Sequence, residues 1–265
     1  MKICSSTPMS PCTRPRRQGV MPSAFLIRRC KRYWIRELPL EADLRQALAG
    51  QQFHLYYQIQ VDSLHRPLGA EVLLRWQHPE RGFVFPDQFI PLAEETGLIV
   101  PIGLWVLQTA CAQLTVWQHD ALTRDLALAV NVSAKQFHQA DFVEQVRQVL
   151  LESGAKPSLL KLELTESTVL ENVEDTIARM REIKMLGVSF SMDDFGTGYS
   201  SLQYLKRLPL GQIKIDRSFV SDITSDHNDA AIVQAIIMMT GALGLNVIAE
   251  GVETEAQRDF MDRHG

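Results

Sequence analysis

The chain has 265 residues, of which 46% are hydrophobic and 22% charged, and this size fits one large α/β barrel or two small domains. No apolar run approaches the roughly 20 residues of a membrane-spanning helix, so no transmembrane segment is expected. Residues 37–265 hold 18 basic and 31 acidic side chains. This balance argues against nonspecific binding to DNA or other nucleic acids, although metal ions can mediate contact with a phosphate ligand.

Residues 1–36 differ from the rest of the chain. They hold nine Lys or Arg and no acidic residue, and Pro8, Pro11, Pro15 and Pro22 interrupt any regular element. We expect a disordered basic segment, best interpreted as a linker remnant rather than a nucleic-acid or membrane arm. Three of the four cysteines lie there, and no C-x-x-C occurs. A cytoplasmic, reducing setting without a disulfide framework or zinc site is therefore expected.

From residue 37 the sequence alternates between strands and helices. Strands are predicted at 54–61, 69–76, 126–133, 160–166, 188–195, 212–219 and 245–251. Helices are predicted at 38–50, 86–117 in two pieces, 142–154, 173–186, 200–208 and 230–243, and a last helix begins at the capping box of Thr254 and Gln257. This alternation predicts a parallel sheet covered by helices. Seven strands are one short of a (β/α)₈ barrel. A doubly wound sheet fits the count, but the sequence lacks its phosphate loop.

Polar side chains interrupt the apolar strands, mostly late in each strand. They are Glu71, Arg75, Asn131, Glu163, Glu166, Asp193, Asp194, Lys214, Asp216, Glu250 and Glu253. Each alone is an ordinary polar residue on a strand or turn. In a barrel, however, the carboxyl ends of the strands converge on one pocket. The set therefore predicts a cluster of oxygen donors.

The stretch SMDDFGTGYSS places Asp193 and Asp194 side by side before a glycine-rich turn. Adjacent carboxylates repel each other, and a hard divalent cation offsets that repulsion. Oxygen ligands favour Mg²⁺ or Mn²⁺, and two such ions bridged by Asp193 could act on a phosphodiester. Glu250 would take a proton from water and Lys214 would stabilise the developing charge. An enolase-like proton abstraction with Lys214 as base uses much the same groups.

These motifs resemble the EAL-domain family of cyclic di-GMP phosphodiesterases from about Leu44 to the last residue. The matching runs are LYYQIQVD, GAEVLLRW, FIPLAEETGLIVPIG, NVSAKQF, LELTES, DDFGTGYSSL, IKIDRSFV and AEGVET. The family signature reads Glu71-Val72-Leu73 here, with Val in place of Ala. The resemblance implies a modified TIM (β/α)₈ barrel whose first strand runs antiparallel, and hydrolysis of cyclic di-GMP to linear pGpG with two Mg²⁺ or Mn²⁺ ions.

The resemblance also implies roles for individual residues. Metal ligands would be Glu71, Asn131, Glu163, Asp193 and Asp194, and the catalytic pair would be Lys214 and Glu250. Substrate contacts and support would come from Gln58, Arg75, Asp216 and Glu253. Glu166 would anchor the loop at 195–201, which the family uses to couple substrate binding, metal binding and dimerisation.

Two features depart from the family pattern. Residues 1–36 resemble neither the sensory nor the GGDEF domains that usually lie upstream, and the sequence stops before the family's eighth strand. We therefore expect seven barrel strands, an incomplete domain over 37–265, two open sheet edges, reduced stability and weak turnover. The alternatives are a module that binds cyclic di-GMP or a partner without hydrolysis, and a fragment that folds poorly alone.

Overall fold

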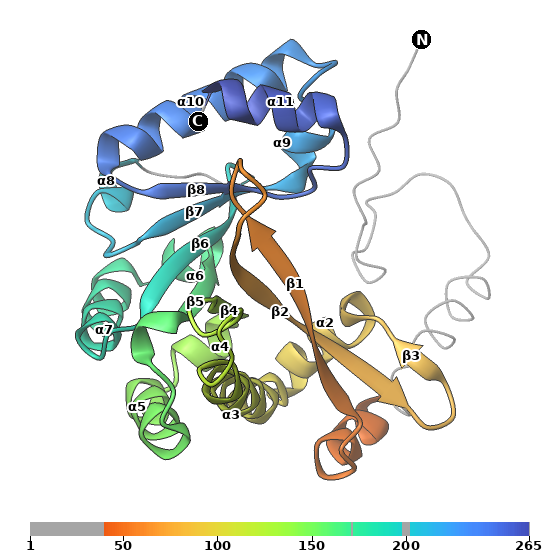
Figure 1. The fold of residues 1–265 in the computed structure, drawn as a ribbon. Helices are drawn as coiled ribbons and strands as arrows, with labels where there is room; N and C mark the ends of the chain where they lie inside the picture. Colours follow the sequence, from red (N-terminus) through yellow and green to blue (C-terminus); the bar gives the residue numbers. More distant parts are fainter. Residues whose placement is uncertain (1–39, 171, 198–201, 265) are drawn as a thin grey trace, which may run out of the picture.

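A computed structural model describes residues 40–170, 172–197 and 202–264, so the expected disordered segment at 1–36 lies outside the described residues. In this part of the chain seven strands form a curled sheet in the order β1-β2-β4-β5-β6-β7-β8, and a short β3 pairs with β2 (Figure 1). The strands are β1 (Phe53–Val61), β2 (Pro67–His78), β3 (Gly82–Val84), β4 (Ala127–Asn131), β5 (Leu160–Thr165), β6 (Ser189–Phe195), β7 (Gln212–Ile215) and β8 (Asn246–Ala249).

The sheet has the predicted modified-barrel topology. β1 pairs antiparallel with β2, whereas the steps from β2 through β8 are parallel. The sequential strand order excludes the doubly wound alternative, whose order reverses at a switch point. Within the described residues β1 pairs only with β2 and β8 only with β7, so the sheet is a half-barrel open between β1 and β8.

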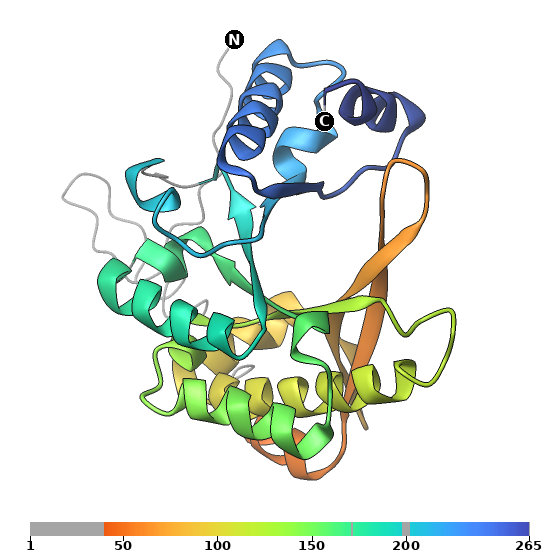
Figure 2. The ribbon, with the colours of Figure 1, turned by 60° about the vertical axis from the view of Figure 1, so that its left-hand side comes forward.

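Helices cover the convex face of the sheet, as Figures 1 and 2 show from two directions. The first helix spans residues 40–49. The others are α2 (Pro86–Thr96), α3 (Ile99–Trp117), α4 (Ala134–Phe137), α5 (Phe142–Ser153), η1 (Pro157–Leu159), α6 (Glu166–Leu170), α7 (Val173–Met185), α8 (Leu202–Leu205), α9 (Arg217–Ser221), α10 (His227–Leu243) and α11 (Glu255–His264). The helix predicted at 200–208 is described only from 202 onward.

The hydrophobic core lies between the helices and the convex face of the sheet. Leu128, Leu162, Phe190 and Ile213 come from four neighbouring strands, and each is fully buried in it. Because side chains alternate along a strand, the polar residues next to these core residues point to the concave face instead. The polar interruptions in the strands are therefore the inner lining of the half-barrel.

Four predicted strands, β4, β5, β7 and β8, end earlier than expected, and polar residues at helix starts explain two of these ends. β7 stops at Ile215 because Asp216 caps α9, and its carboxylate accepts a 3.0 Å hydrogen bond from the Ser218 N–H. β5 stops at Thr165, and Glu166 begins α6. In β5 and β7 the alternating sequence predicts a longer strand, but a polar residue begins a helix and the strand stops there. The short β3 was not predicted.

One helix in the described chain, α3, is long and apolar enough to cross a membrane by length and composition, so the expectation that no apolar run approaches that length was wrong. Its side chains Ile102, Val106, Leu107 and Ala110 are buried in the core. Packing between the sheet and α5 accounts for this apolar sequence. Length and composition alone are weak evidence for a membrane span.

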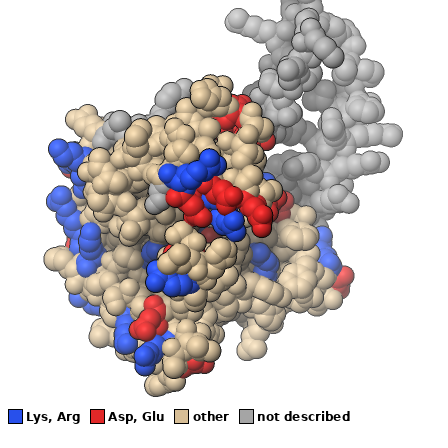
Figure 3. Space-filling model, turned by 45° about the horizontal axis from the view of Figure 1, so that its top comes forward, with Lys and Arg blue, Asp and Glu red and all other residues tan. Residues whose placement is uncertain are grey.

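The surface on the side of α10 and α11 carries mixed charge, with Asp and Glu side chains beside Lys and Arg side chains (Figure 3). On α11, Arg258 lies 2.7 Å from Asp259 and 4.0 Å from Asp262. Exposed pairs of this kind stabilise a fold by less than about 1 kcal/mol each. The stability of this region therefore depends on other contacts.

Gln257 provides such a contact at the start of α11. The predicted capping box is present, because the Gln257 N–H donates to Thr254 Oγ1 at 3.3 Å and Gln257 Oε1 accepts from the Thr254 N–H at 2.9 Å. The same Oε1 accepts from the Glu253 N–H at 2.8 Å. Gln257 Nε2 donates to the backbone oxygens of Val220 and Ser221, at the end of α9. One buried amide thus joins α11 to α9.

We predict that Gln257→Ala lowers the free energy of unfolding by about 2–3 kcal/mol, because it leaves buried backbone groups without partners. Chemical denaturation monitored by circular dichroism measures this change. The control is Gln148→Ala on the exposed face of α5, where Gln148 bonds only Glu152 and the expected loss is below about 0.5 kcal/mol. Equal stabilities of the two variants would contradict the role of Gln257.

Candidate active site

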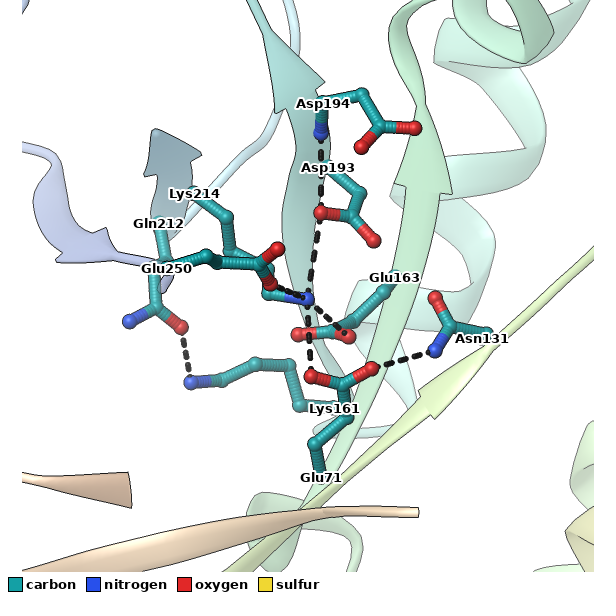
Figure 4. A network of polar contacts seen from close by, with 9 residues as sticks. All are labelled: Glu71, Asn131, Lys161, Glu163, Asp193, Asp194, Gln212, Lys214 and Glu250. Atoms are coloured by element: carbon teal, nitrogen blue, oxygen red, sulfur yellow. Dashed lines mark hydrogen bonds and ion pairs between the residues drawn. The ribbon is translucent and has the colours of Figure 1, made fainter. Parts of the chain in front are cut away.

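Six predicted site residues meet on the concave face (Figure 4), five of them toward the carboxyl ends of their strands and Glu71 within the long strand β2. Each comes from a different strand or from the residue after it: Glu71 (β2), Asn131 (β4), Glu163 (β5), Asp193 (β6), Lys214 (β7) and Glu250 (after β8). Parallel strands end on the same side of the sheet, so residues as far apart as 71 and 250 become neighbours.

Lys214 lies at the centre of this group. Its Nζ is 3.1 Å from Glu71 Oε2, 3.0 Å from Glu163 Oε2, 3.2 Å from Asp193 Oδ1 and 2.5 Å from Glu250 Oε1. The Lys214 side chain is 1% exposed. Four carboxylates share one ammonium, so the group carries a formal excess of three negative charges.

Asn131 orients the carboxylate of Glu71. Its Nδ2 donates to Glu71 Oε1 at 2.8 Å, while Glu71 Oε2 faces Lys214. Asn131 is also in register with Glu163 across the β4–β5 pair. The amide oxygen of Asn131 thus stays available beside two carboxylates.

Burial and mutual repulsion shift the proton affinities of the group. Burial, helped by the nearby charges of Glu71 and Asp193 and opposed by Lys214, raises the pKa of Glu163 to about 7. Burial also raises the pKa of Glu250. Burial alone would lower the pKa of Lys214, but the surrounding carboxylates raise it overall, so Lys214 stays an ammonium. The site therefore holds more negative charge than its own cation neutralises.

The donor set suits a divalent cation. The carboxylates and the Asn131 amide offer oxygen atoms as metal ligands, which hard ions such as Mg²⁺ prefer. Among the described residues, Glu163 Oε1 is buried without a hydrogen-bond partner. In the described chain no three His, Cys, Asp or Glu side chains are spaced around a common metal position, because the carboxylates converge on Lys214 instead. Metal binding would therefore need side chains to move away from Lys214.

Asp194 differs from its neighbour Asp193. Its φ is 54°, in the left-handed region that Gly, Asn and Asp adopt more readily than other residues, and its N–H donates to Asp193 Oδ1 at 2.9 Å. The register of β6 with β7 shifts between Met192 and Phe195. Burial and the charges of Asp193 and Asp216 raise the pKa of Asp194. The two carboxylates therefore lie side by side but differ in direction (Figure 4).

Gly251 lets the chain turn directly after Glu250. Its φ is 70°, and a Cβ at this position would lie 2.8 Å from Arg217 Cβ. Only glycine fits a left-handed turn this close to α9. The turn places Glu250 over the end of β7, next to Lys214.

The other predicted residues lie around this group without joining it in the described structure. Gln58 is opposite Glu71 in the β1–β2 register. The guanidinium of Arg75 lies 5.8 Å from the centre of the Tyr56 ring and donates to the backbone oxygen of Leu74. These residues border the concave face next to the cluster.

Three further predicted residues, Asp216, Glu253 and Glu166, lie outside the cluster. Asp216 caps α9, and Glu253 donates its backbone N–H to Gln257. Glu166 is 5% exposed, and neither carboxylate oxygen has a partner among the described residues. Part of the loop that Glu166 was predicted to anchor, residues 198–201, lies outside the described residues.

The sequence analysis missed Lys161 and Gln212. Lys161 Nζ donates to Gln212 Oε1 beneath the cluster (Figure 4). Lys161 precedes Glu163 by two positions and Gln212 precedes Lys214 by two, so each shares a strand face with a predicted site residue. That spacing in KLEL and QIKI was the available signal.

The sequence profile of the EAL domain matches residues 41–265. The chain belongs to the EAL domain family. The bifunctional diguanylate cyclase/cyclic di-GMP phosphodiesterase MucR of Pseudomonas aeruginosa is 50% identical to this EAL domain over 230 residues, which are 86% of this chain and 33% of MucR. The cyclic di-GMP phosphodiesterase PdeR of Escherichia coli is 39% identical over 226 residues, 85% of this chain and 34% of PdeR.

A solved structure described as the PaMucR phosphodiesterase in complex with c-di-GMP aligns with this EAL domain at a TM-score of 0.83 and 49% identity. The alignment covers 86% of this chain and 92% of that one. The chain spans about a third of the length of the curated relatives it matches. Its similarity to them therefore concerns one of their domains.

We predict that Lys214→Met destabilises the metal-free protein by about 3–5 kcal/mol, because four carboxylates lose their shared cation. Thermal unfolding in EDTA measures the loss, and added Mn²⁺ is expected to recover part of it. Lys206→Met, at an exposed lysine, is the matched control and is expected to unfold like the wild type. A Lys214→Met protein as stable as the wild type in EDTA would contradict the central role of this ammonium.

We predict that the metal-free protein loses stability as the pH rises from about 4.5 to about 7. The pKa of Glu163 is higher in the folded protein, about 7, than its ordinary value of 4.5. The folded state then binds more protons than the unfolded state in this interval, so stability is greatest at the acidic end and falls by roughly 3 kcal/mol at most. Denaturant unfolding in EDTA at a series of pH values measures the slope.

Glu163→Gln is expected to flatten this dependence, because the amide does not titrate. Glu182→Gln, at an exposed position on α7, should keep the wild-type slope. A slope that survives in Glu163→Gln would assign the titration to another group.

Proposed function

We propose that this EAL domain hydrolyses cyclic di-GMP to linear pGpG, with Mg²⁺ or Mn²⁺ as cofactor, in bacterial second-messenger signalling. The observation that carries the proposal is the meeting of four carboxylates, one amide and one ammonium at the strand ends. The names of the relatives support it, because MucR and PdeR are described as acting on cyclic di-GMP.

The metal-binding residues in this proposal are Glu71, Asn131, Glu163 and Asp193, and Asp194 contributes to a second ion. Bound ions would polarise the phosphodiester and lower the pKa of a bound water. To face such ions, Glu71, Glu163 and Asp193 would turn from the Lys214 ammonium. Their excess negative charge and the unpartnered oxygen of Glu163 favour that exchange.

Glu250 is the proposed general base. Burial raises its pKa, which brings its proton affinity nearer to that needed for proton transfer at neutral pH. Glu250 takes one proton of the attacking water, and the water oxygen bonds to phosphorus. The bond between phosphorus and one ribose oxygen breaks, and that oxygen takes up a proton from solvent. Lys214, 2.5 Å from Glu250, stabilises the negative charge that develops on the phosphate.

Substrate contacts are assigned to the border of the cluster. Arg75 can offer paired N–H donors to a phosphate, a geometry that guanidinium groups favour. Gln58 lies next to Glu71 on the neighbouring strand. Asp216 and Glu253 flank Lys214 and Glu250 in the sequence, and Glu166 is assigned to hold the loop after β6.

The wider assembly is also a proposal, since the chain spans about a third of its curated relatives. We infer that the protein is cytoplasmic, forms a homodimer and is regulated by a sensory or GGDEF domain, as the family resemblance implies. The runner-up function is binding of cyclic di-GMP without turnover. The open edges of the described sheet at β1 and β8 favour it, because Glu250 follows the edge strand β8 directly.

We predict that Glu250→Gln lowers the rate of pGpG formation by about 100-fold or more, because the amide cannot accept a proton. Incubation with cyclic di-GMP and Mg²⁺, followed by chromatography of the products, measures the rate. Calorimetric titration with cyclic di-GMP in Ca²⁺ should show that binding is retained. The control is Glu255→Gln, an exposed glutamate at the start of α11, which should turn over like the wild type.

A Glu250→Gln variant that is as fast as the wild type would contradict the assigned base. A wild-type protein that binds cyclic di-GMP but releases no pGpG would favour the binding module instead.

A further inference from the structure

A second polar tier lies inside the half-barrel, beneath the carboxylate cluster. Lys161 on β5 and Gln212 on β7 each lie two residues before a member of the cluster, Glu163 and Lys214. Residues two apart on a strand share a face and are about 7 Å apart. The Lys161–Gln212 pair therefore runs below the cluster from one strand to another, across the face of β6 (Figure 4).

The contacts of Lys161 are unusual for a half-buried cation. Its ammonium donates to the neutral amide oxygen of Gln212, and Gln212 is itself 6% exposed. Within the described chain no carboxylate forms an ion pair with Lys161. The Lys161 side chain is only partly exposed, so solvent screens its charge incompletely. An ammonium is thus held next to the cluster without being neutralised by a direct partner.

Lys161 nevertheless interacts electrostatically with the cluster. Burial lowers the pKa of Lys161, the attraction of Glu163 raises it, and repulsion from Lys214 lowers it again. Lys161 and Glu163 lie two residues apart on one face of β5, close enough for their charges to interact. The reverse also holds, because Coulomb interaction is mutual: Lys161 attracts the carboxylates and repels any cation that they bind.

We propose that Lys161, held in place by Gln212, is a positioning residue that sets the divalent-metal affinity of the carboxylate cluster. It stabilises the metal-free site by offsetting part of the excess negative charge that Lys214 leaves. It weakens metal binding, because its positive charge beneath the cluster repels a divalent cation. The inference rests on the proposed function, since it assumes that these carboxylates bind the metal ions.

A purely structural Lys161 would behave differently. If the pair with Gln212 only supports the packing of β5 and β7, its loss lowers the stability of the metal-free and metal-bound forms equally. The metal dissociation constant then stays the same. Affinity and stability together therefore separate the two roles.

The experiment compares Lys161→Met, Lys161→Arg and Lys156→Met with the wild type in the full chain. Lys161→Met removes the charge but keeps a long unbranched side chain, and Lys161→Arg keeps the charge. Lys156→Met removes an exposed lysine before β5 and controls for net charge. Calorimetric titration with Mn²⁺ gives the dissociation constant, and thermal unfolding in EDTA and in saturating Mn²⁺ gives the two stabilities.

We expect Lys161→Met to bind Mn²⁺ about tenfold more tightly than the wild type. It should also unfold at a lower temperature in EDTA, with the difference reduced in Mn²⁺. Lys161→Arg and Lys156→Met should bind like the wild type. Lys161→Gln, whose shorter neutral side chain fits the same space, should also bind more tightly and serves if Lys161→Met does not fold.

An unchanged or weaker Mn²⁺ affinity in the folded neutral variants, with the wild type binding Mn²⁺ normally, would overturn the inference and leave the proposed function standing. A wild-type protein that binds no Mn²⁺ would overturn both.

Discussion

The contact between Lys214 and four carboxylates is the interaction on which the concave face depends. Taking a charged side chain out of water costs several kcal/mol, so the buried Glu163 and Lys214 and their three partly buried neighbours are tolerated only with close opposite charges. The Lys214 ammonium lies within 3.2 Å of each carboxylate, so it offsets much of that cost. It does not offset all of it, because three negative charges remain. This remainder makes the site receptive to cations.

The curled sheet makes this contact possible. Strands β2, β4, β5, β6, β7 and β8 are parallel and their carboxyl ends lie on one side of the sheet. The alternation of side chains sends core residues outward and charged residues inward. Phe190 and Leu162 pack under the helices while Glu163 faces Lys214. The alternation that places core residues on the convex face therefore places the charged residues together on the concave face. The residues that stabilise the fold and those that form the cluster lie on opposite faces of the same strands.

Much of this arrangement was predictable from the sequence. Strand order, the antiparallel first strand and the convergence of Glu71, Glu163 and Asp193 follow from alternation, from polar residues late in strands and from the family resemblance. Strand ends were predicted less well. Alternation continues through IKIDRSF, and only the capping bond of Asp216 shows where the helix begins. Lys161 was missed because its chemistry depends on Gln212, a residue 51 positions away and on another strand.

Gln257 lies away from the carboxylate cluster but affects how two of its residues are held. Its amide joins the segment that follows Glu250 to the end of α9, and α9 follows the strand that carries Lys214. One side chain on the outer rim thus clamps together the two backbone segments from which Lys214 and Glu250 project. A defect there would misalign Lys214 and Glu250 in a protein whose cluster side chains are all intact.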